Sequence, residues 1–242
     1  MASRGTNAKI LIDEFNFSCD TNTLTVSGSV SALDSTALCA LANTFEVGTP
    51  TGMIEHGGFN SGSGAGTIHD ELHDRLGTST PVYVAALLLT DIAACPAYVC
   101  QNSWGNQLTI GMPIDGLMTL AGSWNASGGL VRGLRIADGT LSAVAAGTAY
   151  DTGAAGTAGG QAFLFVSAIA GTATSATIDV ESSATEAGVY ASEGTFTVSA
   201  VGVQKITMSG TVNRWLRISV TDLGGATSIT AICIAGVSGV TY

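Results

Sequence analysis

Two histidines in one short segment are the residues whose spacing could support chemistry. His69-Asp-Glu-Leu-His73 would place both imidazoles on one face of a helix, where they could hold zinc. In the zinc-peptidase motif a glutamate directly follows the first histidine, but here Asp70 holds that position and Glu71 is displaced by one residue. The displacement turns the Glu71 carboxylate by roughly 100° around the helix axis. A third ligand would have to be His56 or a distant carboxylate, so we expect a solvated helix face, with an adventitious or structural metal as the alternative.

Other segments that resemble active sites have simpler interpretations. Gly62-Ser-Gly-Ala-Gly66 lacks the preceding strand and the lysine of a phosphate-binding loop, and it indicates a hinge or contact loop. Asp13-Glu14, and Asp179 with Glu181, could be proposed as acid–base pairs. On a strand, however, Asp179 and Glu181 share one face, which is typical of a solvent face or a calcium contact. We expect no catalytic residue, no cofactor-binding residue, no metal ligand and no enzymatic activity; a metal-dependent hydrolase is the enzyme alternative.

The five cysteines show no pairing pattern. An odd number in a chain of 242 residues is typical of buried, reduced thiols, and it predicts assembly in a reducing cytoplasm. The five are Cys19, Cys39, Cys95, Cys100 and Cys233.

Charged residues are scarce and mostly acidic. They make up 11% of the chain, less than half of the usual share of about 25%. Because mixed surface charge normally prevents self-association, we expect much of the surface to be buried against other copies. The net charge is −10, from 5 basic and 12 acidic residues over 1–150 and 3 basic and 6 acidic over 151–242. No basic stripe is present, which argues against binding to nucleic-acid phosphates and suits a conduit that must not adhere to DNA.

The amino-terminal part predicts strands around one helix. Thr67–Leu76 has a capping threonine, acidic residues in its first turn and a terminating Gly77, and its apolar stripe would lie on a sheet. Ala32–Pro50 is expected to be a loop with a helical turn near Ala37–Leu41. The expected strands are Ala8–Phe17 and Thr23–Val30, joined by Ser18–Asn22, and then Thr51–Phe59, Val82–Leu89, Ala97–Asn102, Gln107–Gly111 and Leu117–Ala126.

The carboxy-terminal part predicts a small β-sandwich. A segment rich in Gly, Ala, Thr and Asp, residues 138–160, is expected to connect it to the first domain, which gives domains of 1–150 and 151–242. The expected strands are Ala162–Ala170, Ala176–Ser182, Gly194–Ser199, Val203–Met208, Arg214–Thr221 and Ser228–Ala235. The expected core residues are Phe163, Phe165, Ile178, Val180, Phe196, Trp215 or Leu216, and Ile232 or Ile234.

Nothing in the sequence indicates a membrane protein or a secreted one. The longest apolar run, Val82–Leu89, is too short to span a bilayer. Met1–Thr6 leads directly into a strand pattern, so we expect no signal peptide.

The pattern of the whole chain resembles a phage protein family. Structural proteins of long-tailed phages carry an appended domain that resembles the carboxy-terminal third in five segments. These are Gln161-Ala-Phe-Leu-Phe-Val-Ser-Ala-Ile169, Ala176-Thr-Ile-Asp-Val-Glu-Ser-Ser183, Val203-Gln-Lys-Ile-Thr207, Asn213-Arg-Trp-Leu-Arg-Ile-Ser-Val220 and Gly224-Gly-Ala-Thr-Ser-Ile-Thr230. The amino-terminal layout is similar to the major tail tube proteins of siphophages: an opening strand pair, a loop with Leu33-Asp-Ser-Thr36, a Gly-flanked strand, the helix, and further strands.

The resemblance implies an all-β protein with a tail-tube-type β-sandwich or barrel, one flanking helix, and a carboxy-terminal immunoglobulin-like sandwich. Six copies would close a ring, and rings would stack through loops into a tube for DNA ejection. The loop Ala32–Pro50 and the turn at 60–66 are the expected contact elements. The implied partners are other copies, tape-measure, tail-tip and tail-terminator proteins, and host-surface glycans for the carboxy-terminal domain. DNA would pass through without specific binding, and the implied location is the virion tail, assembled in the host cytoplasm.

The alternative is a binding module. A phage decoration or tail-tip protein whose carboxy-terminal sandwich recognises host-surface carbohydrate would share the same β-rich pattern. Assembly separates the two, because a tube subunit forms rings or tubes whereas a module stays discrete.

Overall fold

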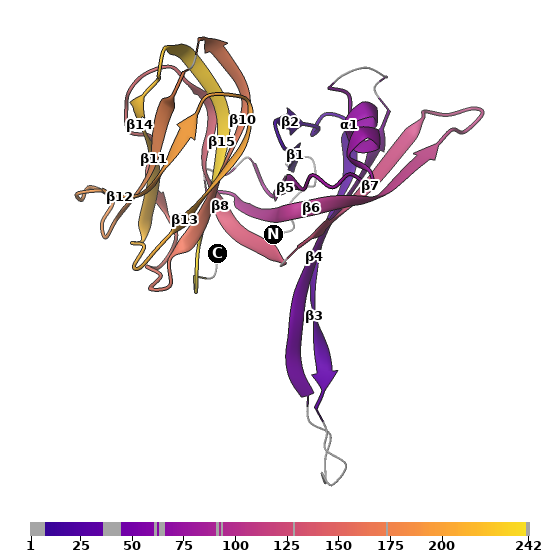
Figure 1. Cartoon of the computed structure of the whole chain (residues 1–242), viewed down its shortest axis with the longest axis horizontal. Coiled ribbons are helices and arrows are strands. Elements are labelled where there is room, and N and C mark those ends of the chain that lie inside the picture. The colour runs from indigo at the N-terminus through magenta and orange to yellow at the C-terminus, as the bar shows by residue number, and fades with distance from the viewer. Residues whose placement is uncertain are drawn as a thin grey trace. The chain divides into compact units, whose positions relative to one another are not determined.

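The fold was analysed in a computed structural model that describes residues 8–35, 45–60, 62, 66–90, 92, 94–127, 129–172 and 174–240. It is an antiparallel β protein with one helix in the described ranges, so the all-β prediction is confirmed (Figure 1). The chain divides into two compact units. The first comprises Met1–Cys19, Ala85–Val99 and Val131–Tyr242, and the second comprises Asp20–Val84 and Cys100–Leu130.

The first unit is built on two sheets. The larger has the strand order β13-β10-β15-β8-β6-β5-β1-β2, and the smaller has the order β12-β11-β14-β9. The strands of the larger sheet are β1 (Lys9–Ile12), β2 (Phe15–Asn16), β5 (Val82–Leu87), β6 (Pro96–Gly111), β8 (Leu130–Leu141), β10 (Gly160–Gly171), β13 (Gly202–Met208) and β15 (Ala226–Val237). Those of the smaller sheet are β9 (Tyr150–Asp151), β11 (Ala176–Ser183), β12 (Ala191–Val198) and β14 (Trp215–Asp222).

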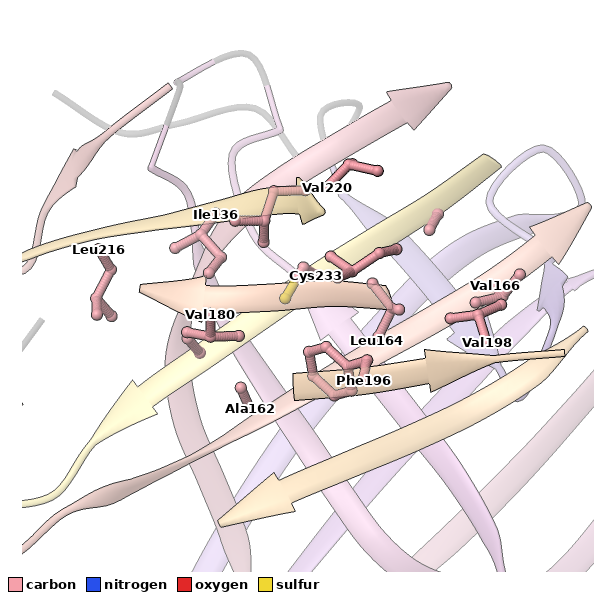
Figure 2. Packing of buried hydrophobic residues seen from close by; sticks show 14 of the residues in the cluster. Ile136, Ala162, Leu164, Val166, Val180, Phe196, Val198, Leu216, Val220 and Cys233 are labelled. Carbon is pink, nitrogen blue, oxygen red and sulfur yellow. The ribbon is translucent and has the colours of Figure 1, made fainter. Parts of the chain in front are cut away.

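A closed apolar core lies between the smaller sheet and the strands β8, β10, β13 and β15 (Figure 2). Strict alternation along β11 and β14 directs every second side chain into it, as the burial of Ile178, Val180 and Leu216 shows. Phe196 of β12 fills the space between them and is 1% exposed. These four residues confirm the expected core.

Four other expected core residues face the opposite side of the larger sheet. Because side chains alternate along a strand, β10 gives Ala162, Leu164 and Val166 to the sandwich core, and β15 gives Cys233. The expectation that Phe163, Phe165 and either Ile232 or Ile234 belong to this core was therefore wrong: these residues are buried, but they are not part of the sandwich core.

The expected division at residue 150 does not coincide with the two units. Strand β8 pairs antiparallel with β15 from Ile229↔Leu141 to Ala235↔Leu134, and Leu134 and Ile136 enter the sandwich core. Much of the segment expected to be the connector, residues 138–160, also has defined structure. It includes the end of β8, the short strand β9 and the bridge Gly156↔Val212.

The second unit contains the remaining strands of the larger sheet, in the order β3-β4-β7-β6, and one helix among the described residues. Its elements are β3 (Thr21–Asp34), β4 (Phe45–Phe59), α1 (Ile68–Arg75) and β7 (Thr119–Ala126), together with Cys100–Gly111 of β6. The helix lies where it was predicted, with Thr67 at its amino-terminal cap and Gly77 at φ +70° after it. Ile68 and Leu72 are buried, whereas Leu76 is 41% exposed and leaves the predicted apolar stripe.

Several predicted boundaries differ in this part of the chain. Ala8–Phe17 is a small hairpin of β1 and β2 with a turn at Asp13, and Thr23–Val30 belongs to β3, whose partner is β4. The two strands expected between 97 and 111 are one strand, β6. In the expected loop Ala32–Pro50, the described residues extend β3 and β4, and the helical turn at Ala37–Leu41 lies outside the described residues.

Within the described ranges, no helix has the length and apolar character that a membrane span requires.

Candidate functional site

Strand β3 is the most unusual element of the second unit, because β4 is its one hydrogen-bonded neighbour in the described part of the chain. It is 14 residues long and reads TNTLTVSGSVSALD. Natural edge strands are normally short, or they carry lysine or proline that prevents another chain from pairing with them. β3 has neither residue, and its one charged residue, Asp34, lies at its end. Its register shifts fall at Thr21/Thr23 and Val30/Ala32, which leaves a regular edge between them.

The far half of β3 and β4 is a two-stranded ribbon. β7 pairs with β4 only from Gly52 to Phe59, whereas β3 and β4 continue to the pair Asp34↔Phe45. The ribbon can be followed in indigo and violet in Figure 1. Four large apolar side chains on it are exposed, and we name them the arm tip: Val30 (53%), Leu33 (54%), Phe45 (61%) and Val47 (85%).

A second group of exposed apolar residues lies in the turn that joins β6 and β7. We name it the turn tip: Met112 (72%), Ile114 (101%), Leu117 (68%) and Met118 (41%). The register places it at the opposite end of the sheet from the arm tip, because Phe59 at the end of β4 pairs with Thr119 and Thr119 pairs with Gly111. One sheet therefore carries an apolar group at each end.

Helix α1 covers one face of this sheet. The covered side chains include Ile54, His56 and Trp124, which are almost fully buried. Gly122 permits the close approach of the helix, since a Cβ at this position would lie 2.9 Å from both His56 Cε1 and Leu72 Cδ2. The helix thus fixes the sheet from one side.

His56 is buried without a hydrogen bond. Neither of its ring nitrogens has a partner among the described residues. Burial without a counter-charge lowers the pKa of His56 from 6.5 to about 4, because the imidazolium form loses its hydration. His56 is therefore a neutral core residue at neutral pH.

The opposite face of the sheet is polar and shallowly hollowed. A groove of about 300 Å³ lies along Thr23, Thr25, Glu55, Gln107 and Thr109. A second groove, of about 330 Å³, lies along Ser27, Ser29, Thr51, Met53 and Asn125. Hydroxyl and amide groups line both grooves, and Glu55 is the one charged residue among their lining residues.

The charge of the chain is concentrated in this unit. Its sequence ranges contain eight acidic residues and one basic residue, Arg75, which gives a net charge of −7, whereas those of the first unit give −3 from ten acidic and seven basic residues. Arg75 forms an ion pair with Glu71, one helical turn earlier. The electrostatic potential of the second unit is therefore expected to repel phosphates.

The candidate metal residues do not come together in the described residues, where no group of three His, Cys, Asp or Glu side chains could hold an ion. His69 Nδ1 lies 3.1 Å from Asp70, and His73 Nδ1 lies 3.3 Å from Asp74, so each imidazole is next to its own neighbour in sequence. His56 lies on a different element, beneath α1.

Two of the candidate carboxylates, Asp179 and Glu181, bind protein side chains. Asp179 accepts a hydrogen bond from Thr195, and Glu181 pairs with Arg217 at 2.7 Å. Both lie on the outer face of the smaller sheet, as the alternation predicted. Asp13 and Glu14 lie in the turn between β1 and β2.

The thiols are free in the described residues, and Cys39 lies outside them. Burial raises the pKa of the Cys95 thiol, raises the pKa of Cys100 to about 12, and raises the pKa of Cys233 further. Cys19 is exposed, which differs from the expectation that all five are buried. Of the glycine-rich turn, Gly62 donates a backbone hydrogen bond to Asn60 Oδ1 at 3.1 Å.

Sequence reasoning missed the length of β3 and β4. The half of each strand that forms the arm is mostly exposed, so it has no alternation of burial. The period-2 pattern appears only from Gly52 onward, where α1 covers the sheet.

The chain matches no protein-family model and no curated protein. The solved structures that resemble it over half of its length or more include three of phage-like particles. A chain in the virion of a native gene transfer agent particle has a TM-score of 0.42 and 12% identity over 53% of this chain and 97% of its own length. The SPP1 Dit protein, described as a paradigm of the hub adsorption apparatus in phages that infect Gram-positive bacteria, has a TM-score of 0.37 and 11% identity over 95% and 98%. A chain of the anti-feeding prophage baseplate has a TM-score of 0.34 and 9% identity over 51% and 92%. At these identities and TM-scores the likenesses do not assign the chain to a family.

Proposed function

We propose that the chain is a virion structural protein, the major subunit of a phage tail tube. In this proposal, copies join into rings through the second unit, and stacked rings enclose the conduit for DNA. The observation that carries the proposal is the long, unprotected edge of β3 on an acidic sheet. The sequence resemblance to siphophage tube proteins gives the same function.

Lateral contact follows from the chemistry of a sheet edge. The free edge of β3 presents a row of backbone N–H and C=O groups that a strand from a second copy can pair with. If a different sheet edge of the next copy supplies that strand, each subunit uses two different surfaces, and the contact repeats. A heterologous contact of this kind closes a ring when its rotation permits, and the resemblance implies six copies.

Axial contact follows from the two apolar tips. The arm tip and the turn tip lie at opposite ends of the sheet, so one ring would present arm tips to the turn tips of the next. Burial of their apolar side chains would contribute roughly 25 cal/mol per Å² of covered surface. In a stacked tube each tip would be covered by the other kind of tip from a neighbouring ring. This contact would explain why both tips are exposed in the single chain.

The polar face suits a lumen. Hydroxyl and amide side chains line its grooves with one carboxylate, Glu55, and the whole unit carries a net charge of −7. DNA phosphates would be repelled instead of bound, which lets the genome move without adhesion. Tape-measure, tail-tip and tail-terminator proteins, and a virion location after assembly in the host cytoplasm, belong to the same proposal.

The test compares a position of β3 with an exposed position of the first unit. Val26 of β3 pairs with Ile54 on the face that α1 covers. Val26→Lys would place an unpaired charge in the ring contact, and we expect the concentration needed for assembly to rise at least about 100-fold. Val201→Lys, at a position that is 49% exposed in the first unit, is the matched control, and we expect it to assemble.

Sedimentation velocity of the full chain measures both variants, and far-UV circular dichroism verifies that each is folded. Assembly of folded Val26→Lys at the wild-type concentration would contradict the β3 contact. If Val26→Lys does not fold, Val26→Thr with a second substitution, Leu24→Lys, tests the same edge.

A further inference from the structure

The first unit contains a small pocket that the tube proposal does not use. Its volume is about 90 Å³, which exceeds the space that a single water molecule needs. Residues of β1, β2 and the turn between them line one part of the pocket, and residues of β8, β10 and β15 line the rest. All of them belong to the first unit.

The buried part of the pocket is apolar. Leu11, Phe165 and Ile232 line it, and they are 3%, 3% and 9% exposed. An apolar surface of this kind is covered more favourably by carbon atoms than by water or a bare ion. A suitable occupant therefore has an alkyl portion.

Three carboxylates also line the pocket, and one of them lacks a partner. Asp138 Oδ2 accepts hydrogen bonds from Lys9 Nζ at 2.7 Å and from Arg135 Nη1 at 2.9 Å. Glu14 is half-buried and has no hydrogen bond or ion pair with any described residue. Asp13, Glu14 and Asp138 set three negative charges against the two positive charges on Asp138, which leaves one negative charge uncompensated.

Other polar side chains of the pocket are already hydrogen-bonded. Asn16 Oδ1 accepts a hydrogen bond from the Ser18 backbone N–H at 3.1 Å, and Ser167 Oγ donates one to the Thr230 carbonyl at 3.3 Å. Glu14 is therefore the acceptor that remains for an occupant. A side chain with an alkyl stem and a cationic head, as in lysine or arginine, matches both the apolar surface and the carboxylate.

The chain itself supplies an unpaired cation of this kind. Among the seven basic residues that the structure describes, six form an ion pair or a cation–π contact: Lys9, Arg75, Arg135, Lys205, Arg214 and Arg217. Arg132 of β8 is exposed and has no such partner among the described residues. It cannot fill the pocket of its own copy, because Arg132 and Asp138 lie six residues apart on one strand, a distance of roughly 20 Å. Arg132 could reach the pocket only from a second copy.

We propose that the pocket at Glu14 receives the Arg132 side chain of a neighbouring copy. The guanidinium pairs with the Glu14 carboxylate, and the alkyl stem packs against Phe165 and Ile232. This inference rests on the self-assembly in the proposed function, and it adds a contact between first units to the β3 contact. The pocket and the arginine are different surfaces of one chain, so the contact is heterologous and can repeat around a ring.

The test exchanges the two charges and measures assembly of the full chain by sedimentation velocity. Glu14→Arg and Arg132→Glu each bring like charges together, and we expect each to raise the concentration needed for assembly at least about ten-fold. The double variant restores opposite charges, and its assembly concentration should return to within about three-fold of the wild type. Glu186→Arg, at an exposed position outside the pocket, changes the net charge as Glu14→Arg does and should assemble like the wild type.

Two results would overturn this contact while the wild type still assembles. One is single variants that assemble like the wild type. The other is a double variant no better than its weaker single, which would mean that a different cation fills the pocket. A wild-type chain that stays monomeric would overturn the tube proposal as well, so the two failures are distinguishable.

Far-UV circular dichroism verifies that each variant is folded. If Glu14→Arg does not fold, Glu14→Gln and Arg132→Gln replace the exchange. Each alone should weaken assembly, and their combination should weaken it no more than one of them does, because both remove the same pair. Additive weakening would contradict the contact.

Discussion

The two units of the chain use β-sheets in opposite ways. In the first unit, two sheets enclose a core, and most of its long strands have neighbours on both sides. In the second unit, a 14-residue strand has one neighbour, and the arm tip and turn tip expose eight large apolar side chains. The second unit also carries the greater net charge, −7 against −3, although it has fewer residues. Under the proposed function, this difference would assign stability to the first unit and association to the second.

The largest expected effect comes from a chain that ends at residue 150. Such a chain loses β15, and with it the partner of β8 and the core around Leu134 and Ile136. We expect the remainder of the first unit to unfold or aggregate, measured by circular dichroism and by solubility. A division at residue 150 predicts instead a folded fragment that still assembles, and that result would contradict the pairing of β8 with β15.

Truncation of Phe196 tests how much the closed core stabilises the first unit. Phe196→Ala removes a ring that is 1% exposed in the closed core, and we expect a loss of about 3–5 kcal/mol in the free energy of unfolding. Urea denaturation measures it. A loss below about 1 kcal/mol would mean that the core between the two sheets is not closed.

His56 makes the second unit sensitive to acid. Because its pKa is about 4 in the folded chain and 6.5 in the unfolded chain, the unfolded state takes up the proton first as the pH falls. Stability is complete above about pH 6.5 and declines between pH 6.5 and 4 by up to about 3 kcal/mol. In His56→Met this decline should disappear from thermal unfolding curves recorded across that range. The same decline in the variant would assign it to other groups.

The smallest effect on stability is expected at the arm tip. Val47 is 85% exposed, so Val47→Asp should change the free energy of unfolding by less than about 0.5 kcal/mol. The same change places a charge in the proposed contact between rings, so tubes should shorten into single rings. If light scattering shows that the tubes of Val47→Asp are as long as those of the wild type, Val47 does not take part in the axial contact.

The sequence correctly predicted the strands along which buried and exposed side chains alternate. Each strand expected between 162 and 235 is present to within a few residues, because β11 and β14 have one face in the core and the other in solvent. The helix was predicted from its cap, its stop at Gly77 and its apolar stripe.

The remainder depends on contacts that are distant in the sequence. β8 contains Gly133 and Gly139 as well as polar residues, so its sequence does not show a clear strand pattern. Its partner β15 lies about 90 residues later in the chain. The change of composition at 138–160 therefore suggested a domain boundary, although the pairing of β8 with β15 crosses it. Burial does not alternate along the arm, because most of its residues are exposed on both faces. The sequence showed Asp179 and Glu181 only as a same-face pair of carboxylates, since their partners Thr195 and Arg217 come from other strands.

Cryo-electron microscopy of the purified full-length protein tests the β3 contact most directly. The expected result is a hollow tube of stacked rings in which β3 of one copy lies about 4.8 Å from a strand of the next, with the grooved polar face toward the lumen. Discrete particles at high concentration, or an assembly that leaves the edge of β3 in solvent, would contradict it.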